Sequence, residues 1–371
     1  MPTYNTVTPP RTLPPILVYD KSATDFSSNG LRCLTPTVAE VEMELNKAPT
    51  LRMEHPIDDR GVWRDIKLSS IVCVPIRYRD QMRYQPMRVY SITKTRTGEK
   101  ATILVEARHV YYDLNYEYIE SFFGVYEDGS TAIQAAFNHA YEPDGSSVPM
   151  PHDNFTYDSD LSFVVVSVEK CSVTQALEII AHRGGEGFGY LTQAELYVDG
   201  FYFSINHRME GSLDDSFDIA VGINVQGISA KYSNDNRANG FAVTNGESFY
   251  ISEPTSLEPL RLPYNKVVPL SPSYPDYVQN PVEEIVYFRE FMDSKRELEV
   301  SYDISVVDMP NLDGYKDFRK IATLEVGDTG RITDEQFEIS TNQKIIKKKY
   351  DAIKHLTVSI GLGNAKSSIL G

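Results

Sequence analysis

In the segment that begins at Thr37, a strict alternation of apolar and acidic side chains from Ala39 to Leu45 is the feature that most constrains the fold. A period of two residues is that of a β-strand with one buried face and one solvated face. With a rise of about 3.4 Å per residue, its neighbouring carboxylates are about 7 Å apart and must face water. The buried side is expected to hold Ala39, Val41, Met43 and Leu45, and the solvated side Glu40, Glu42 and Glu44.

The aromatic composition also favours strands. The 371 residues include 24 Tyr and 16 Phe but one Trp, and aromatic side chains fit the half-buried surface of a pleated sheet. With 41% hydrophobic and 24% charged residues, the chain can bury a core. At roughly 100 to 200 residues per domain, its length predicts two to four folding units.

The charge balance limits the classes of partner. The chain has 36 Lys and Arg against 52 Asp and Glu, a net charge of −16, so its surface as a whole should repel nucleic acid and anionic membranes. This excludes a dedicated DNA-binding protein. No apolar run approaches the roughly 20 residues of a membrane span, and the start lacks a basic-then-apolar leader. We therefore expect neither membrane insertion nor secretion.

The first third of the chain has mainly strand signals. Pro9-Pro10 and Pro14-Pro15 predict that the first thirty residues form an arm or edge element with little regular pairing. Beyond the alternating segment, the pattern is typical of a barrel or sandwich. Strands are expected at residues 67–77, 87–95 and 101–110, with a turn at Thr97-Gly98.

The middle of the chain predicts a mixture of helices and strands. A helix should begin at Ser130 or Thr131, and a second should follow a capping box formed by Ser172 and Gln175. The dipeptide Asp199-Gly200 between two apolar runs predicts a tight hairpin. This part reads as α+β, with further strands at 162–168, 194–198 and 201–206 and with the second helix stopping at Gly184-Gly185.

The last third is less regular. Strands are expected at 217–230 and 298–307, and a third helix at 282–292. A turn is expected at Gly327-Asp328. Residues 344–356 fit a helix nearly as well as two strands, and periodicity alone does not decide between them.

No local motif predicts catalysis. The glycine-rich segment 184–189 resembles a phosphate loop, but it follows a helix instead of preceding one, which favours a helix C-cap and turn. The seven histidines show no H-E-x-x-H pattern, no G-x-S-x-G is present, and the three cysteines form no C-x-x-C pair. We predict buried free thiols, no catalytic residue, no cofactor and no metal site.

Two alternatives stay open. Acidic clusters at Asp58-Asp59, at Asp153 to Asp160 and at Asp214 to Asp218 could ligate calcium through oxygen, although solvated turns are the simpler interpretation. The many Tyr side chains, with Asp and Glu, would suit a sugar-binding groove, whereas core and interface packing is the more common role of aromatic residues.

Several stretches, taken in order, resemble the hub-forming region of phage tail-tip proteins, the tail-associated or prophage endopeptidase tail family of siphophages. No single stretch is specific, and the resemblance rests on their order and spacing from about residue 35 to 364. The stretches that carry the resemblance are residues 90–95, 101–114 with Tyr112-Asp113-Leu114, 175–186 with Gly184-Gly185-Glu186, 199–205 with Asp199-Gly200, 222–225, 324–329 with Gly327-Asp328, 348–352, and 360–364 with Gly363-Asn364.

The resemblance implies the fold of the baseplate hubs of contractile tails, α+β and β-rich. Two β-barrel-like tube domains would be interrupted by two peripheral α+β domains, and residues 344–356 would be strands. The hub region would end near Gly371, so the endopeptidase activity of longer family members is not expected. The implied parts are an arm (1–34), a first tube domain (35–116), an inserted domain (117–212), a second tube domain (213–250 plus 320–371) and a second peripheral domain (251–319).

The implied function is that of a non-enzymatic structural hub at the distal tail tip of a virion. Three copies would close a ring that caps or lines the channel for genome exit, as in the short hub-only forms of lactococcal-type siphophages. Implied partners are the distal tail protein ring, receptor-binding proteins, the tape-measure protein and DNA in transit without specific binding. We expect Glu40, Glu42 and Glu44 to face the channel. The alternative function is a virion protein that binds or degrades carbohydrate of the host envelope.

Overall fold

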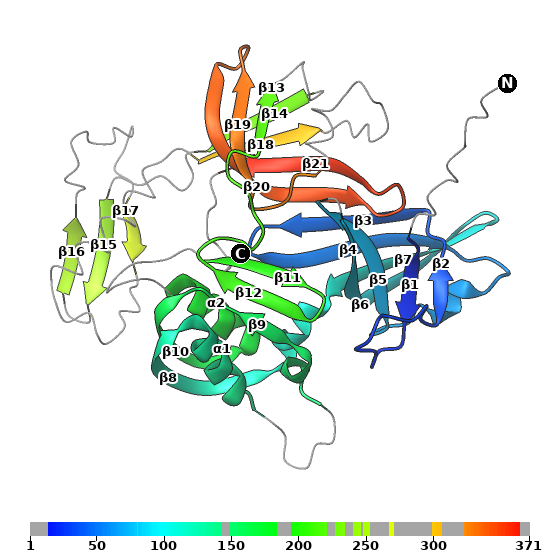
Figure 1. Ribbon diagram of the computed structural model, residues 1–371, viewed down its shortest axis with the longest axis horizontal. Helices are drawn as coiled ribbons and strands as arrows, with labels where there is room; N and C mark the ends of the chain where they lie inside the picture. Colours follow the sequence, from blue (N-terminus) through cyan, green and yellow to red (C-terminus); the bar gives the residue numbers. More distant parts are fainter. Residues whose placement is uncertain are drawn as a thin grey trace, which may run out of the picture. The chain divides into compact units, whose positions relative to one another are not determined.

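The computed structural model describes residues 14–79, 81–141, 149–183, 194–220, 227–233, 240–245, 248–252, 267–270, 299–305 and 323–363. The chain divides into two compact units. The first comprises residues 1–41, 50–109 and 351–355, and the second comprises 42–49, 110–350 and 356–371. Both are rich in strands (Figure 1). The predicted β-rich α+β class is confirmed, while the five-part division of the chain stays a prediction.

The first unit is built on an antiparallel sheet. Its strand order is β4-β7-β6-β5-β1-β2, with β3 beside β4. The bounds are β1 Ile16–Tyr19, β2 Arg32–Leu34, β3 Val38–Glu44, β4 Lys47–Pro56, the short 3₁₀ helix η1 Val62–Asp65, β5 Ile71–Tyr78, β6 Gln81–Thr97 and β7 Lys100–His109, and the ends of β3 and β4 continue into the second unit. The predicted turn at Thr97-Gly98 joins β6 to β7, where Thr97 pairs with Lys100.

The expectation of little regular pairing in the first thirty residues is wrong for Ile16–Tyr19. This segment pairs with β2 on one side and with β5 on the other, where Leu17 lies opposite Cys73. All four of its side chains are buried. A strand buried on both faces shows no alternation, so the flanking prolines dominated the prediction. The expectation of buried thiols holds for Cys73, whereas Cys33 is exposed and Cys171 is half-buried.

A helix-covered hairpin opens the second unit. Strands β8 (Tyr118–Asp128) and β10 (Ser162–Ser172) pair antiparallel, and helices α1 (Gly129–Asn138) and α2 (Val173–Arg183) pack on them and on each other (Figure 1). The predicted capping box is present: Ser172 N–H donates to Gln175 Oε1 at 2.9 Å, and Gln175 N–H donates to Ser172 Oγ at 3.2 Å. Helix α1 begins one or two residues earlier than predicted, because Asp128 caps it by accepting from the Thr131 N–H.

Beside these helices lies a three-stranded sheet, β11 (Glu195–Asp199), β12 (Tyr202–Asn206) and β9 (Thr156–Asp158). The predicted hairpin joins β11 and β12, with Asp199 opposite Tyr202 and Gly200 at φ +62°. An aromatic cluster centred on Phe203, which is fully buried, links this sheet to α1 and to η2 (Val110–Tyr116). These aromatic side chains are core, as the simpler interpretation held. The short 3₁₀ helix η3 spans Pro151–Asn154.

The remainder of the second unit is mainly β. Its core comprises Phe217, Ile219, Tyr302, Ile304, Ile332, Ile345, Ile360 and their neighbours. The strands run in the order β14-β18-β21-β20, and β19 pairs with both β20 and β13. Their bounds are β13 Phe217–Ala220, β14 Gly227–Ser233, β18 Glu299–Ser305, β19 Thr329–Asp334, β20 Ile339–Asp351 and β21 Leu356–Gly363, with a separate sheet of β15 Gly240–Asn245, β16 Ser248–Ser252 and β17 Val267–Leu270.

The ambiguous stretch 344–356 consists of the end of β20, a turn and the start of β21, as the family resemblance implied. Ile345, Lys348 and Tyr350 are buried side chains of β20. The predicted helix at 282–292 and the predicted cap at Gly184-Gly185 lie outside the described residues. In the described ranges, no helix is both long and apolar enough to cross a lipid bilayer.

Candidate functional site

The structure places Tyr112, Asp113 and Leu114 in the 3₁₀ helix η2. Leu114 is fully buried and Asp113 nearly so, while the Tyr112 hydroxyl donates to the Ala48 carbonyl at 3.2 Å. This bond ties η2 to the start of β4. The three residues therefore act as packing and anchoring groups inside the second unit.

Gly327 and Asp328 form a tight buried turn before β19. Gly327 has φ +91°, in the left-handed region that glycine adopts without strain. The fully buried Asp328 accepts from two backbone groups, Leu213 N–H and Glu325 N–H, each at 2.8 Å. One carboxylate thus holds together two loops that are 115 residues apart in sequence.

A buried ion pair stands beside this turn. The ammonium of Lys348 lies 2.8 Å from Glu325 Oε2 and 2.9 Å from the Leu324 carbonyl oxygen. Lys348 is fully buried and Glu325 is 4% exposed. Sequence reasoning missed this pair because the run Lys347-Lys348-Lys349 looks like a solvated surface. The signal that could have found it is the two-residue spacing between Lys348 and Tyr350, which places both on one face once the segment is read as a strand.

The other signature residues are structural or undescribed. Asp199 and Gly200 make the β11–β12 turn, and Gly363 ends β21 opposite Ser301. A side chain on Gly363 would meet Ile346. Gly184, Gly185, Glu186 and Asn364 lie outside the described residues.

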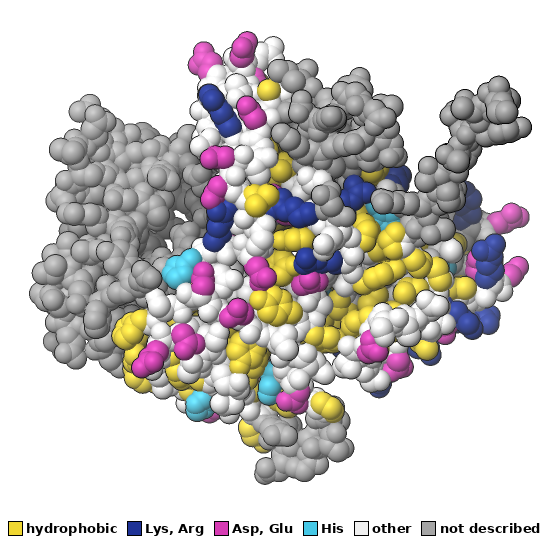
Figure 2. Space-filling view, in the orientation of Figure 1, with side chains coloured by type: hydrophobic (Ala, Val, Ile, Leu, Met, Phe, Trp, Pro, Cys, Tyr) yellow, Lys and Arg dark blue, Asp and Glu magenta, His cyan; other side chains and the backbone are white. Residues whose placement is uncertain are grey.

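The acidic row on β3 is accompanied by lysines. Glu42 pairs with Lys347 of β20 at 2.7 Å, and Glu44 pairs with Lys47 at 2.7 Å. The hydrogen bond to Glu42 is the main cause that raises the pKa of Lys347. The negative charge of the row is therefore partly compensated, which the β3 sequence alone does not reveal. Figure 2 likewise shows acidic and basic side chains interspersed on the face in view.

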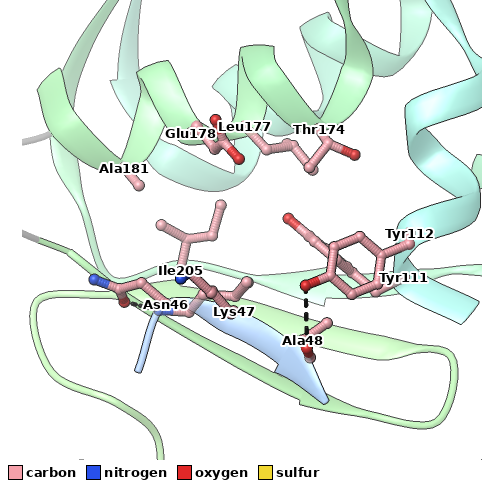
Figure 3. Close-up of a pocket in the computed structure, with 11 residues that line it drawn as sticks. Asn46, Lys47, Ala48, Tyr111, Tyr112, Thr174, Leu177, Glu178, Ala181 and Ile205 are labelled. Carbon is pink, nitrogen blue, oxygen red and sulfur yellow. Dashed lines mark hydrogen bonds between the residues drawn. The ribbon is translucent and has the colours of Figure 1, made fainter. Parts of the chain in front are cut away.

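A pocket of about 210 Å³ lies within the second unit. One wall is helix α2, and facing it are η2, the β3–β4 turn and strands β11 and β12 (Figure 3). Most of the lining is apolar. It comprises Asn46, Lys47, Ala48, Tyr111, Tyr112, Thr174, Leu177, Glu178, Ala181, Leu196 and Ile205.

Three polar side chains of the pocket wall, those of Glu178, Tyr111 and Thr174, are affected by their burial. Burial raises the pKa of Glu178 to about 7. Burial, followed by the charge of Glu178, also raises the pKa of the Tyr111 hydroxyl. The Thr174 hydroxyl oxygen is buried with no hydrogen-bond partner. Among the described residues no cluster of His, Cys, Asp or Glu is arranged to hold a metal ion.

Replacing Glu178 with glutamine should change the dependence of stability on pH. The pKa of this acid rises from 4.5 to about 7 in the fold, so the folded protein keeps a proton that the unfolded chain releases. Wild-type stability should therefore fall as the pH rises from 4.5 to 7, and then level off. Because Glu178 is partly exposed, we expect the free energy of unfolding of Glu178→Gln at pH 8 to exceed that of the wild type by only about 1–3 kcal/mol.

Urea unfolding at pH 5 and at pH 8 measures this effect. The variant should show a smaller difference between the two pH values than the wild type. The matched control is Glu169→Gln, which removes an exposed carboxylate of β10. Equal pH dependence of the wild type and Glu178→Gln would contradict the raised pKa.

Comparison with known proteins gives evidence at the level of the fold. No protein-family model matches the sequence, and no curated protein matches it. Solved structures do match. The prophage tail protein gp18 of Listeria monocytogenes EGD-e is 13% identical, with a TM-score of 0.59 over 96% of each chain. The chain has the fold of a prophage tail protein.

Two other tail proteins support the same conclusion. The tail protein of Neisseria meningitidis MC58 is 11% identical, with a TM-score of 0.60 over 95% of this chain and 96% of that one. The 43 kDa tail protein of prophage MuSo2 from Shewanella oneidensis is 11% identical, with a TM-score of 0.58 over 94% and 97%. The resemblance to phage tail proteins stated from sequence is thereby confirmed for the tail-protein fold.

Proposed function

We propose that this protein is a non-enzymatic structural hub at the distal tip of a siphophage tail. Three copies would form a ring that closes or lines the channel through which the genome leaves. The observation that carries the proposal is the fold shared with three tail proteins, two of them from prophages, over at least 94% of this chain and of each of theirs. Because the similarity extends over whole chains, a short shared motif does not account for it.

An open sheet edge supports assembly with further copies. Strand β14 has seven residues, and β18 is its only neighbour among the described strands. Among the described strands β14 is therefore at an edge of its sheet, and the backbone groups of an edge strand can pair with a second chain. A heterologous contact of this kind closes into a ring when the rotation between copies permits. A trimer in which β14 pairs with the next copy would cover this edge.

The acidic row of β3 is assigned to the channel in this proposal. DNA carries one negative charge per about 1.7 Å of helix axis, so a wall that is not basic lets it pass without being held. Because Glu42 pairs with Lys347, the net negative charge of the row is reduced, and the row repels DNA only weakly. Expected partners are the distal tail protein ring, receptor-binding proteins and the tape-measure protein.

Electron micrographs of the purified protein test the proposal. We expect a three-lobed ring with a central hole or plug. Incubation with purified wall polysaccharide of the host tests the carbohydrate alternative in parallel. Release of reducing ends by a particle that forms no ring would replace the hub proposal with that of a depolymerase.

A further inference from the structure

We propose that the pocket between helix α2 and the β11–β12 hairpin binds one alkylammonium group, a primary ammonium on a short apolar chain. This goes beyond the structural role proposed above. The inference rests on the size of the cavity, the apolar character of most of its wall, and the Glu178 carboxyl and Thr174 hydroxyl on its α2 wall.

The size of the pocket limits the ligand. Sites for drug-sized molecules measure about 300 to 1,000 Å³, whereas this cavity measures about 210 Å³. A nucleotide or an oligosaccharide is therefore excluded, and a single long side chain or a small amine remains. The aliphatic groups that would contact such a chain are Ala48, Leu177, Ala181, Leu196 and Ile205.

The polar groups select a cation. The Glu178 carboxyl lies on the α2 wall, and the Tyr111 hydroxyl points toward that wall from the opposite side (Figure 3). Thr174, 6% exposed, adds a hydroxyl oxygen without a partner. An ammonium has three donors and no acceptor, so it can donate to the Glu178 carboxylate and keep donors for a hydroxyl oxygen of the wall. An anion would be repelled by Glu178, and a neutral alcohol would leave the carboxylate without a counterion.

The protein's own cation at the pocket is engaged elsewhere. The ammonium of Lys47 pairs with Glu44 at 2.7 Å. Lys47 therefore lines the pocket with its aliphatic stem, while its charge is paired with Glu44. The other polar groups on that wall are also bonded: the Tyr112 hydroxyl donates to Ala48, and Asn46 Oδ1 accepts from the Leu196 N–H at 3.0 Å. No basic side chain of the described residues pairs with Glu178.

Binding should depend on pH through Glu178. The titratable groups that line the pocket from the other elements are Tyr111, Tyr112 and Lys47. Because burial raises the pKa of Glu178 to about 7, the carboxylate is mostly ionised at pH 8 and mostly protonated at pH 6. The affinity for an ammonium should therefore be about tenfold lower at pH 6 than at pH 8.

Calorimetry and NMR of the full chain at pH 8 test the inference with three probes. They are n-butylammonium chloride, the lysine analogue Nα-acetyl-lysine methylamide, and the neutral isostere 1-butanol. We expect at least one ammonium probe to bind more tightly than 1-butanol. Stronger binding of n-butylammonium would indicate a free amine as the natural ligand, and stronger binding of the lysine analogue would indicate a protein side chain.

Variants make the test specific. Glu178→Gln should weaken binding of the ammonium at least about tenfold, since a bond to a charged group is lost, and Thr174→Val should weaken it by a smaller factor. Glu169→Gln, on the exposed face of β10, should bind as the wild type does. Failure of both ammonium probes to bind, equal binding of 1-butanol, or an unchanged affinity in Glu178→Gln would each overturn the inference.

Discussion

Replacing Lys348 with methionine is expected to lower the free energy of unfolding by about 3–5 kcal/mol, because the change leaves a buried carboxylate without its partner. The Lys348 ammonium lies 2.8 Å from Glu325 Oε2, and both side chains are buried. Methionine fills a similar volume but offers no donor. The Leu324 carbonyl also loses its bond. Urea unfolding monitored by circular dichroism measures the loss.

Two controls isolate the buried charge as the cause. In the double variant Lys348→Met with Glu325→Leu no charge remains buried, so much of the stability should return. Lys347→Met breaks the half-exposed pair with Glu42 and should change stability by no more than about 1 kcal/mol. If Lys348→Met proved as stable as Lys347→Met, the buried pair would not stabilise the fold.

Replacing Asp328 with alanine is expected to destabilise the second unit by about 2–4 kcal/mol, since one buried and one part-buried N–H group lose their acceptor, at about 1–3 kcal/mol for a buried group. These are the N–H groups of Leu213 and Glu325. The loop that precedes β13 would lose its link to the turn that precedes β19. Amide hydrogen exchange should therefore become faster at Leu213 in particular.

Asp328→Asn is the matched control. Its amide oxygen can still accept one of the two bonds, so it should lose less stability than alanine does. Unchanged exchange at Leu213 in the alanine variant would show that the carboxylate does not hold the two loops together.

Local sequence signals predicted the elements that depend on local chemistry. The Ser172 and Gln175 capping box and the Asp199-Gly200 hairpin are present as expected, because each satisfies its own backbone groups within a few residues. Strand Ile16–Tyr19 was missed because burial on both faces removes alternation. The burial of Lys348 was not predicted because it depends on a partner 23 residues away.

The pocket could not be predicted from the sequence. Its residues come from segments around positions 46–48, 111–112, 174–181, 196 and 205, and only the fold brings these together. Tyr112 was singled out by the family resemblance, but its hydrogen bond to Ala48 gives it an anchoring role. Glu178 and Thr174 are unremarkable in a helical pattern. Only their position in the folded pocket, close to Tyr111, makes them candidate ligand-binding groups.

The mass of the purified protein in solution tests the central claim most directly. The account predicts that light scattering at micromolar concentration gives three times the 41.9 kDa mass of one chain. It also predicts that this mass persists on dilution, since the proposed ring is held by backbone hydrogen bonds between copies at the edge of β14. A stable particle of one chain's mass under the same conditions would contradict the proposed ring.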